Sequence, residues 1–412
     1  MRSTLNLFPF KSATGLALFL ILPFSFLSNA FAEEDIWPTS LPETSAVPFM
    51  FSSESLGTTI GAAAVMKGVG QPQATLFAAG LYSTKGSYMT YLSANNFQIG
   101  HSWLVGANAY NANFKDMDYH LGAAGSNSSN VNEEVFTDSI EAQYHLSANY
   151  ILPIGNAKTI GARAAYLPER KIKGFNPLES GVSSIEFSPF YYSRKLADVA
   201  NWNEPYSNWG MKVNFDWDNR NSVRNTTHGS RTELDFTYSP QTGEQEEWWT
   251  WEFQQSAFFD LGNLGEIINK QVLALDVYLA DTPSWQDGSH HQPPEYAGIK
   301  LGGLYRLRSY SSGRFHGRSA IHYSAEYRVM PDWQPLEDWP IFNLYDVPWW
   351  QWVIFVDAGR VADEFSLSTL HEDMKWSAGG AIRFQVEGIV VRTEMSKGSE
   401  EGLFRVMINQ PF

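Results

Sequence analysis

The chain has 412 residues, no cysteine, a formal net charge of −15 and a pI near 5.0. The acidic balance argues against nucleic acid as a partner, because nucleic-acid binding relies on a basic surface, and the lack of cysteine excludes a disulfide framework. Aromatic residues make up 15% of the chain, with 15 Trp, 19 Tyr and 27 Phe, which is a heavy load for a soluble secreted enzyme. Aromatic girdles at two membrane interfaces would account for that load.

The N-terminus has the three parts of a secretory signal peptide. Arg2 and Lys11 precede an apolar stretch from Ala13 to Leu27, and small residues follow up to Ala32. The stretch is shorter than the roughly 20 residues of a membrane-spanning helix, and the Ala-x-Ala ending favours cleavage over an uncleaved anchor. We therefore predict a signal peptide over residues 1–32. The acidic, proline-containing segment 33–56 is predicted to be a short periplasmic lead.

From residue 57 to residue 412 the chain alternates apolar and polar residues over segments of about ten, a pattern typical of barrel strands. The alternation is clearest in three segments, which are Gly210–Asp218, Gln271–Asp281 and Ser319–Val329. In the last of these, Ile321, Tyr323, Ala325, Tyr327 and Val329 oppose His322, Ser324, Glu326 and Arg328. Charges that point inward fit a water-filled barrel, whereas a soluble sandwich would bury the apolar face. Both readings fit the periodicity alone.

The C-terminus and two tryptophan clusters favour the barrel. The chain ends with an alternating apolar face that consists of Phe404, Val406, Ile408, Gln410 and Phe412. A final strand that ends in an aromatic residue is characteristic of outer-membrane barrels, where it serves as the signal for the barrel assembly machinery. We predict this role for Phe404, Val406, Ile408 and Phe412. The tryptophan clusters at 248–251 and 349–352 are the expected girdles.

These patterns together predict an all-β fold in the bacterial outer membrane. We expect a transmembrane antiparallel β-barrel of about 16 strands over residues 57–412, in contact with outer-membrane lipid. Two connections between strands are unusually long, namely Lys115–Asp138 and Asp281–Gly317. Long connections are usually functional or disordered, so these two connections are the candidate positions of a functional site.

The second long connection contains the run Leu301-Gly302-Gly303-Leu304-Tyr305-Arg306-Leu307-Arg308-Ser309-Tyr310. Together with Asp357-Ala358-Gly359, and with Asp218-Asn219-Arg220 before Gly229, this run resembles the bacterial surface antigen barrels of the BamA and TamA type, in the Omp85 superfamily. In that superfamily the sixth extracellular loop, between the eleventh and twelfth strands, folds into the lumen and carries Gly-Gly followed by Arg-Gly-Tyr or Arg-Gly-Phe. The strand count places 301–310 in that position. The sequence departs from the family pattern at Ser309, where the family usually has glycine.

A luminal arginine needs carboxylate partners, because an unpaired buried charge is costly and the guanidinium group suits bidentate pairing. Strand alternation places Glu326 and Asp357 on the inward faces of neighbouring strands. We therefore predict that Arg308 bridges Glu326 and Asp357 as a latch that holds the loop, with a solvated loop arginine as the alternative. The remaining motif positions are Gly302 and Gly303, which we expect to let the loop approach the wall closely, and Tyr310 and Gly359.

Nothing in the sequence points to an enzyme. Ser12 and Ser128 lie in no nucleophile elbow, and the pair His290–His291 is better explained as solvated than as a metal site. No phosphate loop or dinucleotide fingerprint occurs, so we expect no cofactor and no metal.

The resemblance implies a role in the insertion or translocation of proteins at the outer membrane, with unfolded outer-membrane or secreted proteins as partners. Well-known members of the family carry periplasmic domains that capture substrate. Segment 33–56 is too short to hold one, so we expect a barrel-only member. A gated channel and a membrane anchor for a separate partner protein are the alternatives, and a lipase or protease barrel is a weaker one.

Overall fold

The computed structural model describes residues 43–412, apart from 54–55, 198, 200–201, 203, 244, 287–289, 336–346, 387–388, 401 and 409. The predicted signal peptide and residues 33–42 of the predicted lead lie outside the described residues. Within the described residues, no helix combines the length and the apolar character needed to span a bilayer.

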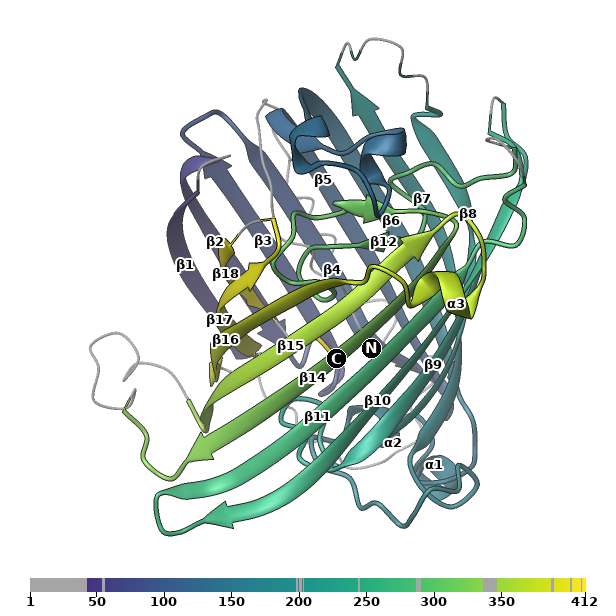
Figure 1. The fold of residues 1–412 in the computed structure, drawn as a ribbon. Helices are drawn as coiled ribbons and strands as arrows, with labels where there is room; N and C mark the ends of the chain where they lie inside the picture. Colours follow the sequence, from purple (N-terminus) through teal and green to yellow (C-terminus); the bar gives the residue numbers. More distant parts are fainter. Residues whose placement is uncertain are drawn as a thin grey trace.

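One antiparallel sheet of 16 strands curls into a barrel (Figure 1). Its strands are β1 (Glu43–Ser53), β2 (Gly57–Lys67), β3 (Thr75–Ser83), β4 (Tyr88–Ile99), β5 (Trp103–Tyr119), β6 (Val135–Ile151), β7 (Val182–Leu196), β8 (Ser207–Arg220), β9 (Gly229–Ser239), β10 (Trp248–Leu264), β11 (Ile268–Asp281), β14 (Ser319–Pro331), β15 (Trp350–Ala362), β16 (Lys375–Val386), β17 (Ile389–Gly398) and β18 (Gly402–Ile408). A separate hairpin of β12 (Lys300–Leu301) and β13 (Phe315–His316) lies within the connection between β11 and β14. The predicted all-β barrel of about 16 strands is confirmed.

The start of the barrel differs from the prediction. β1 pairs with β2 along its whole length, from Glu43 opposite Lys67 to Ser53 opposite Gly57. The part of the predicted lead from Glu43 onward is therefore a barrel strand, and the barrel begins at residue 43 instead of 57. The prolines of this segment favoured a segment outside the sheet. Pro48 is nevertheless compatible with β1, because β1 lies at the edge of the sheet.

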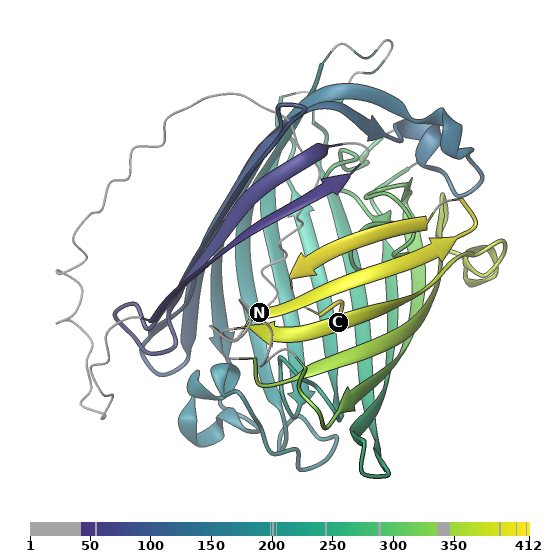
Figure 2. The ribbon, with the colours of Figure 1, turned by 90° about the vertical axis from the view of Figure 1, so that its left-hand side faces the viewer.

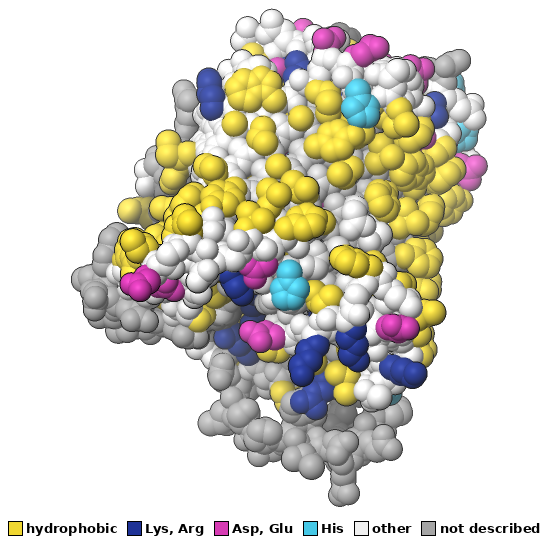
Figure 3. All heavy atoms as spheres, turned by 60° about the horizontal axis from the view of Figure 1, so that its bottom comes forward, with side chains coloured by type: hydrophobic (Ala, Val, Ile, Leu, Met, Phe, Trp, Pro, Cys, Tyr) yellow, Lys and Arg dark blue, Asp and Glu magenta, His cyan; other side chains and the backbone are white. Residues whose placement is uncertain are grey.

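Side chains alternate between lipid and lumen as the sequence predicts. In β11, Leu275 is 38% exposed on the outer face while its neighbour Asp276 is 3% exposed on the inner face. In β14, Ser324, Glu326 and Arg328 are all buried on the inner side. Hydrophobic side chains cover much of the outer wall in Figure 3. The predicted inward charges are therefore present, and the soluble sandwich is wrong.

β1 and β18 are the two ends of the sheet, and they face each other across one side of the barrel (purple and yellow in Figure 2). Among the described residues, each of these two strands pairs with a neighbour on one side only. An edge strand presents a row of backbone N–H and C=O groups to any further strand.

The connections carry the remaining structure. The connection between β5 and β6 holds two short 3-10 helices, η1 (Gly122–Gly125) and η2 (Val131–Glu133), and α3 (Leu367–Leu370) precedes β16. At the opposite end, which the predicted outer-membrane orientation assigns to the periplasm, the connection between β6 and β7 spans residues 152–181 and contains α1 (Ala157–Ile160) and α2 (Arg163–Tyr166). Turns at this end of a barrel are usually short, so this connection is exceptional.

This architecture predicts heat-modifiable migration on a denaturing gel. The unboiled protein should run faster than the boiled protein, because the hydrogen bonds of a barrel sheet must be broken together. Coincident migration of the two samples, together with a mainly helical far-UV spectrum, would contradict the architecture.

Candidate functional site

The connection between β11 and β14, the eleventh and twelfth strands of the sheet, folds into the lumen (Figure 1). Leu307, Tyr310 and Phe315 are fully buried there and form one hydrophobic cluster with Tyr278 and Ala280 of β11. The predicted loop thus occupies the predicted position and is packed as tightly as a protein core.

The structure brings Arg308, Glu326 and Asp357 together. The Nε of Arg308 donates to Asp357 Oδ2 at 3.0 Å and its Nη2 donates to Asp357 Oδ1 at 2.7 Å, which is a bidentate pair. Its Nη1 donates to Glu326 Oε1, and the guanidinium carbon lies 3.5 Å from the centre of the Phe355 ring. All three charged side chains are 0% exposed. Because a removed partner would leave a buried charge, this geometry can hold the loop in place.

Glu326 is shared by three arginines. Arg383 donates to both of its oxygens, at 2.6 and 2.9 Å, and Arg328 donates through Nε at 2.8 Å. A further carboxylate, Glu394, has its Oε2 3.6 Å from the Nη1 atoms of both Arg308 and Arg392. The carboxylate of Asp357 therefore depends on Arg308 for its ion pair, whereas Glu326 does not.

The last strands also hold the backbone of the loop. Arg405 of β18 donates to the carbonyl oxygens of Gly303, Arg308 and Tyr310, at 2.6 to 2.7 Å. Ser396 of β17 donates to the carbonyl oxygen of Arg308 at 2.8 Å. The tip of the loop is therefore fixed to the strands that lead to one free edge of the sheet.

The glycines act differently from the prediction. Gly302 and Gly303 have φ angles of 96° and 109°, and a Cβ on Gly302 would lie 2.3 Å from the carbonyl oxygen of Ser311. They let the loop fold against itself, not against the wall. The close approach to the wall occurs at the strand glycines, because a Cβ on Gly359 would lie 3.1 Å from Leu301 Cδ1 and one on Gly398 would lie 2.1 Å from Ser309 Oγ.

The departure from the family pattern at Ser309 has a local explanation. The left-handed residue of this turn is Leu307, with a φ of 48°, and Ser309 is not among the residues with positive φ. The backbone N–H of Ser309 donates to Ser377 Oγ at 3.0 Å, and the two hydroxyl groups lie 2.8 Å apart. Tyr310 follows with its hydroxyl group 2.8 Å from Ser399 Oγ.

A second buried arginine, Arg314, ties the loop to the extracellular connections. It donates to both carboxylate oxygens of Glu400, between β17 and β18, at 2.7 and 2.9 Å. It also donates to Ser129 Oγ at 2.9 Å and to the carbonyl oxygens of Ser129 and Ala124, between β5 and β6. Arg314 thus links the β17–β18 connection, next to one free edge of the sheet, to the β5–β6 connection.

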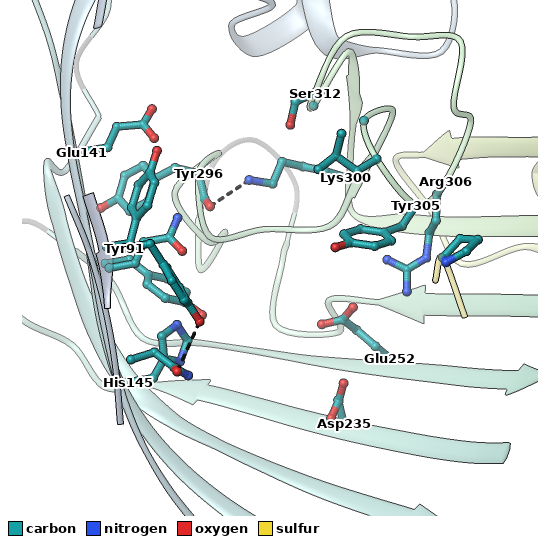
Figure 4. A pocket seen from close by; sticks show the side chains of 18 of the residues that line it. Tyr91, Glu141, His145, Asp235, Glu252, Tyr296, Lys300, Tyr305, Arg306 and Ser312 are labelled. Carbon is teal, nitrogen blue, oxygen red and sulfur yellow. Dashed lines mark hydrogen bonds between the residues drawn. The ribbon is translucent and has the colours of Figure 1, made fainter. Parts of the chain in front are cut away.

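A cavity of about 900 Å³ separates the loop from the opposite wall. Carboxylates of the wall, including Glu141, Asp235 and Glu252, face Lys300 and Arg306 of the loop across it (Figure 4). Lys300 donates to the carbonyl oxygen of Tyr296 at 2.9 Å. The lumen therefore has a polar, charged space suited to water or polar solutes.

The predicted C-terminal face is present only in part. Phe404 and Val406 point outward from β18 and are 65% and 38% exposed. The strand ends at Ile408, whose side chain lies outside the described residues. Phe412 does not continue this face, because it is 4% exposed and packs inside against Phe258, Val272, Ala274 and Met330. Its ring centre lies 6.1 Å from that of Phe258, so burial of a large apolar ring turns the terminus inward.

The assembly role of Phe412 remains a prediction. If the terminal residue is recognised before folding, deletion of Phe412 should reduce the amount of protein in the outer membrane and leave periplasmic fragments. Phe258→Ala is the matched control, because it removes the packing partner and leaves the terminus intact. Equal abundance of the deletion variant and the unmodified protein would refute the signal.

Ser12 lies outside the described residues, and Ser128 and the pair His290–His291 lie in different connections. No cluster of three metal-ligating side chains occurs within the described part of the chain. His290 lies 3.2 Å from Glu246 Oε1 on the exposed surface, and the Ser128 region belongs to the β5–β6 connection.

The sequence analysis did not identify Arg383, Arg405 and Arg314 as residues of the site. Arg383 and Arg405 occupy inward positions of β16 and β18, which the alternation with Ile382, Phe404 and Val406 would have indicated. Arg314 lies on the loop without a periodic signal, so its partners are visible only in the structure.

Several solved structures are similar to this chain in fold. Among solved structures, BamA from Haemophilus ducreyi lacking POTRA domains 1–3 matches 90% of the chain and 70% of its own length, with 14% identity and a TM-score of 0.51. CdiB from Acinetobacter baumannii matches 89% of the chain at 10% identity and a TM-score of 0.52. CdiB from Escherichia coli matches 90% at 10% identity and a TM-score of 0.55. The chain spans 59% and 62% of these two CdiB chains.

At the level of sequence, no curated protein matches the chain. The Omp85 superfamily domain matches residues 81–386, which is most of the barrel. This superfamily consists of outer-membrane β-barrels concerned with the insertion and translocation of proteins. The resemblance read from the loop motif is thereby confirmed, and the chain belongs to the Omp85 superfamily.

Proposed function

We propose that this barrel inserts or translocates proteins at the bacterial outer membrane. The observation that carries the proposal is the fixed luminal loop. Arg308 ties it to Asp357 of β15 and Glu326 of β14, and Arg405 of β18 and Ser396 of β17 hold its backbone next to a free edge of the sheet. An edge strand offers backbone groups with which an incoming strand can pair. In this proposal the luminal loop holds the last strands in register while β1 and β18 receive the substrate.

The test is deletion of the gene followed by a census of outer-membrane proteins and lipids. Loss of specific barrels or surface proteins, restored by the unmodified protein but not by Arg308→Glu, is the expected result. An unchanged census would refute the proposal. If the census is unchanged and a stoichiometric partner copurifies from solubilised membranes, the barrel is an anchor.

A second candidate function is a gated channel, which the luminal cavity of about 900 Å³ favours. The loop and the β5–β6 connection would act as its plug. Conductance in planar bilayers separates the two functions, because a channel shows regular unitary steps in the unmodified protein. A translocator should show no conductance until the contacts of Arg308 are removed.

A further inference from the structure

The exceptional periplasmic connection, residues 152–181, is a built structure and not a loose loop. Arg170 forms an ion pair with Asp218 at 2.8 Å, with 4% and 10% of the two side chains exposed. Its Nε and Nη2 also donate to the carbonyl oxygens of Ala164 and Ala165. Buried apolar side chains of this connection, such as Ala157 and Ala162, pack with Leu104 and Ile151. We call residues 152–181 the periplasmic cap.

One part of the cap lies against the outer face of the barrel wall. Trp217 shares the lipid-facing side of β8 with Phe215, which is 43% exposed, and its indole N–H donates to the carbonyl oxygen of Ser180 at 2.9 Å. Asn219 is on the same side of the strand, accepts a hydrogen bond from Ser180 Oγ at 2.7 Å and donates to the carbonyl oxygen of Gly174 at 2.8 Å. Residues 174–180 therefore sit on the outer side of the wall, at the end of β8.

The exposed side chains of the cap have the chemistry of a membrane-surface anchor. Phe175 and Leu178 are 81% and 64% exposed, although both are large and apolar. The cap contains five basic and two acidic residues in a chain of net charge −15. Lys158, Arg163, Lys171 and Lys173 are exposed, and dark-blue side chains gather at this end of the molecule in Figure 3. Basic residues beside apolar wedges suit an anionic lipid surface.

We propose that the periplasmic cap binds the inner leaflet of the outer membrane, with Phe175 and Leu178 inserted among the acyl chains and Lys171 and Lys173 on anionic phospholipid headgroups. The position outside the wall selects lipid over a protein partner, because the bilayer necessarily surrounds the outer face of β8. The cap would fix how deeply the β6–β9 side of the barrel sits in the membrane, away from the free edges of the sheet. This inference does not depend on protein insertion as the function.

The absence of cysteine allows a direct test. The Phe175→Cys variant is labelled with an environment-sensitive fluorophore and reconstituted into phosphatidylcholine vesicles. One set of vesicles contains nitroxide-labelled phosphatidylcholine, and the other contains the same mole fraction of nitroxide-labelled phosphatidylglycerol. We expect quenching by both lipids and stronger quenching by phosphatidylglycerol. Asn132→Cys, exposed in the β5–β6 connection, is the water-exposed control, and Leu178→Cys replaces the first variant if that variant loses heat-modifiable migration.

The charge arm compares Lys171→Glu/Lys173→Glu with Lys171→Arg/Lys173→Arg, each in the labelled protein. In the Lys171→Glu/Lys173→Glu variant, the preference for phosphatidylglycerol should fall by about fivefold per substituted lysine. In the Lys171→Arg/Lys173→Arg variant, the preference should be unchanged. High salt should reduce the preference of the unmodified protein. Quenching at Phe175 no stronger than at Asn132 would overturn the proposal, and shielding of the same label in intact outer membranes would then indicate a protein partner. Equal quenching by the two lipids would overturn the headgroup assignment.

Discussion

Arg308→Ala is expected to leave the barrel inserted and to release the luminal loop. The wall keeps its strand hydrogen bonds, but Asp357 loses its bidentate partner inside the protein. Removing one member of a buried ion pair costs about 3 to 5 kcal/mol, which luminal water will reduce. Glu326 keeps Arg383 and Arg328, so the loss should concentrate on Asp357. The measurements are protease sensitivity of residues 282–318 on intact cells and conductance in planar bilayers, and both should rise.

Charge reversal sharpens this prediction. Arg308→Glu should be worse than Arg308→Ala, because it adds a carboxylate beside Glu326, Asp357 and Glu394, and Asp357→Arg in the same chain should recover part of the loss. Arg318→Ala is the matched control, since Arg318 belongs to the same loop but its contact with Asp281 is 3.2 Å long and its side chain is 29% exposed, where a pair contributes about 1 kcal/mol or less. If both Arg308 variants match the unmodified protein in protection and conductance, Arg308 does not act as a latch.

Arg314→Ala should open the extracellular mouth of the barrel. Its guanidinium group is fully buried and joins Glu400 to the β5–β6 connection through Ser129 and Ala124, so its removal frees two connections at once and leaves Glu400 without this partner. We expect cleavage in the β5–β6 connection on intact cells and frequent conductance fluctuations, while heat-modifiable migration stays unchanged.

Arg314→Lys is the informative companion variant. A lysine keeps the charge but cannot make the fork of hydrogen bonds that the guanidinium group makes to Glu400 and the two carbonyl groups. It should therefore resemble Arg314→Ala in loop protection. Full protection with lysine would show that charge alone holds the mouth closed, and full protection with alanine would show that Arg314 has no such role.

The sequence determined the strands and the direction of their side chains. A period of two is a local property of extended backbone, so Leu275 facing lipid and Glu326 facing the lumen could be read directly. The Arg308 contacts followed from the same rule, because an enclosed arginine requires carboxylates and Asp357 was on an inward face of a neighbouring strand. Phe404 and Val406 were placed correctly for the same reason.

The tertiary structure alone decided what depends on contacts between distant parts of the chain. Pro48 is compatible with a strand because β1 lies at the edge of the sheet. Phe412 was expected to end the final strand, but its ring packs inside the barrel against Phe258. Gly302 was expected to let the loop approach the wall but instead folds the loop against itself, and Gly398 of the wall makes the close approach to Ser309. The distance between loop and wall is set by packing across the lumen. Arg314 and the periplasmic cap gave no periodic signal, because both lie in connections. The partners of Arg314 are in the distant β5–β6 and β17–β18 connections, and those of the cap include Asp218 of β8 and Leu104 of β5.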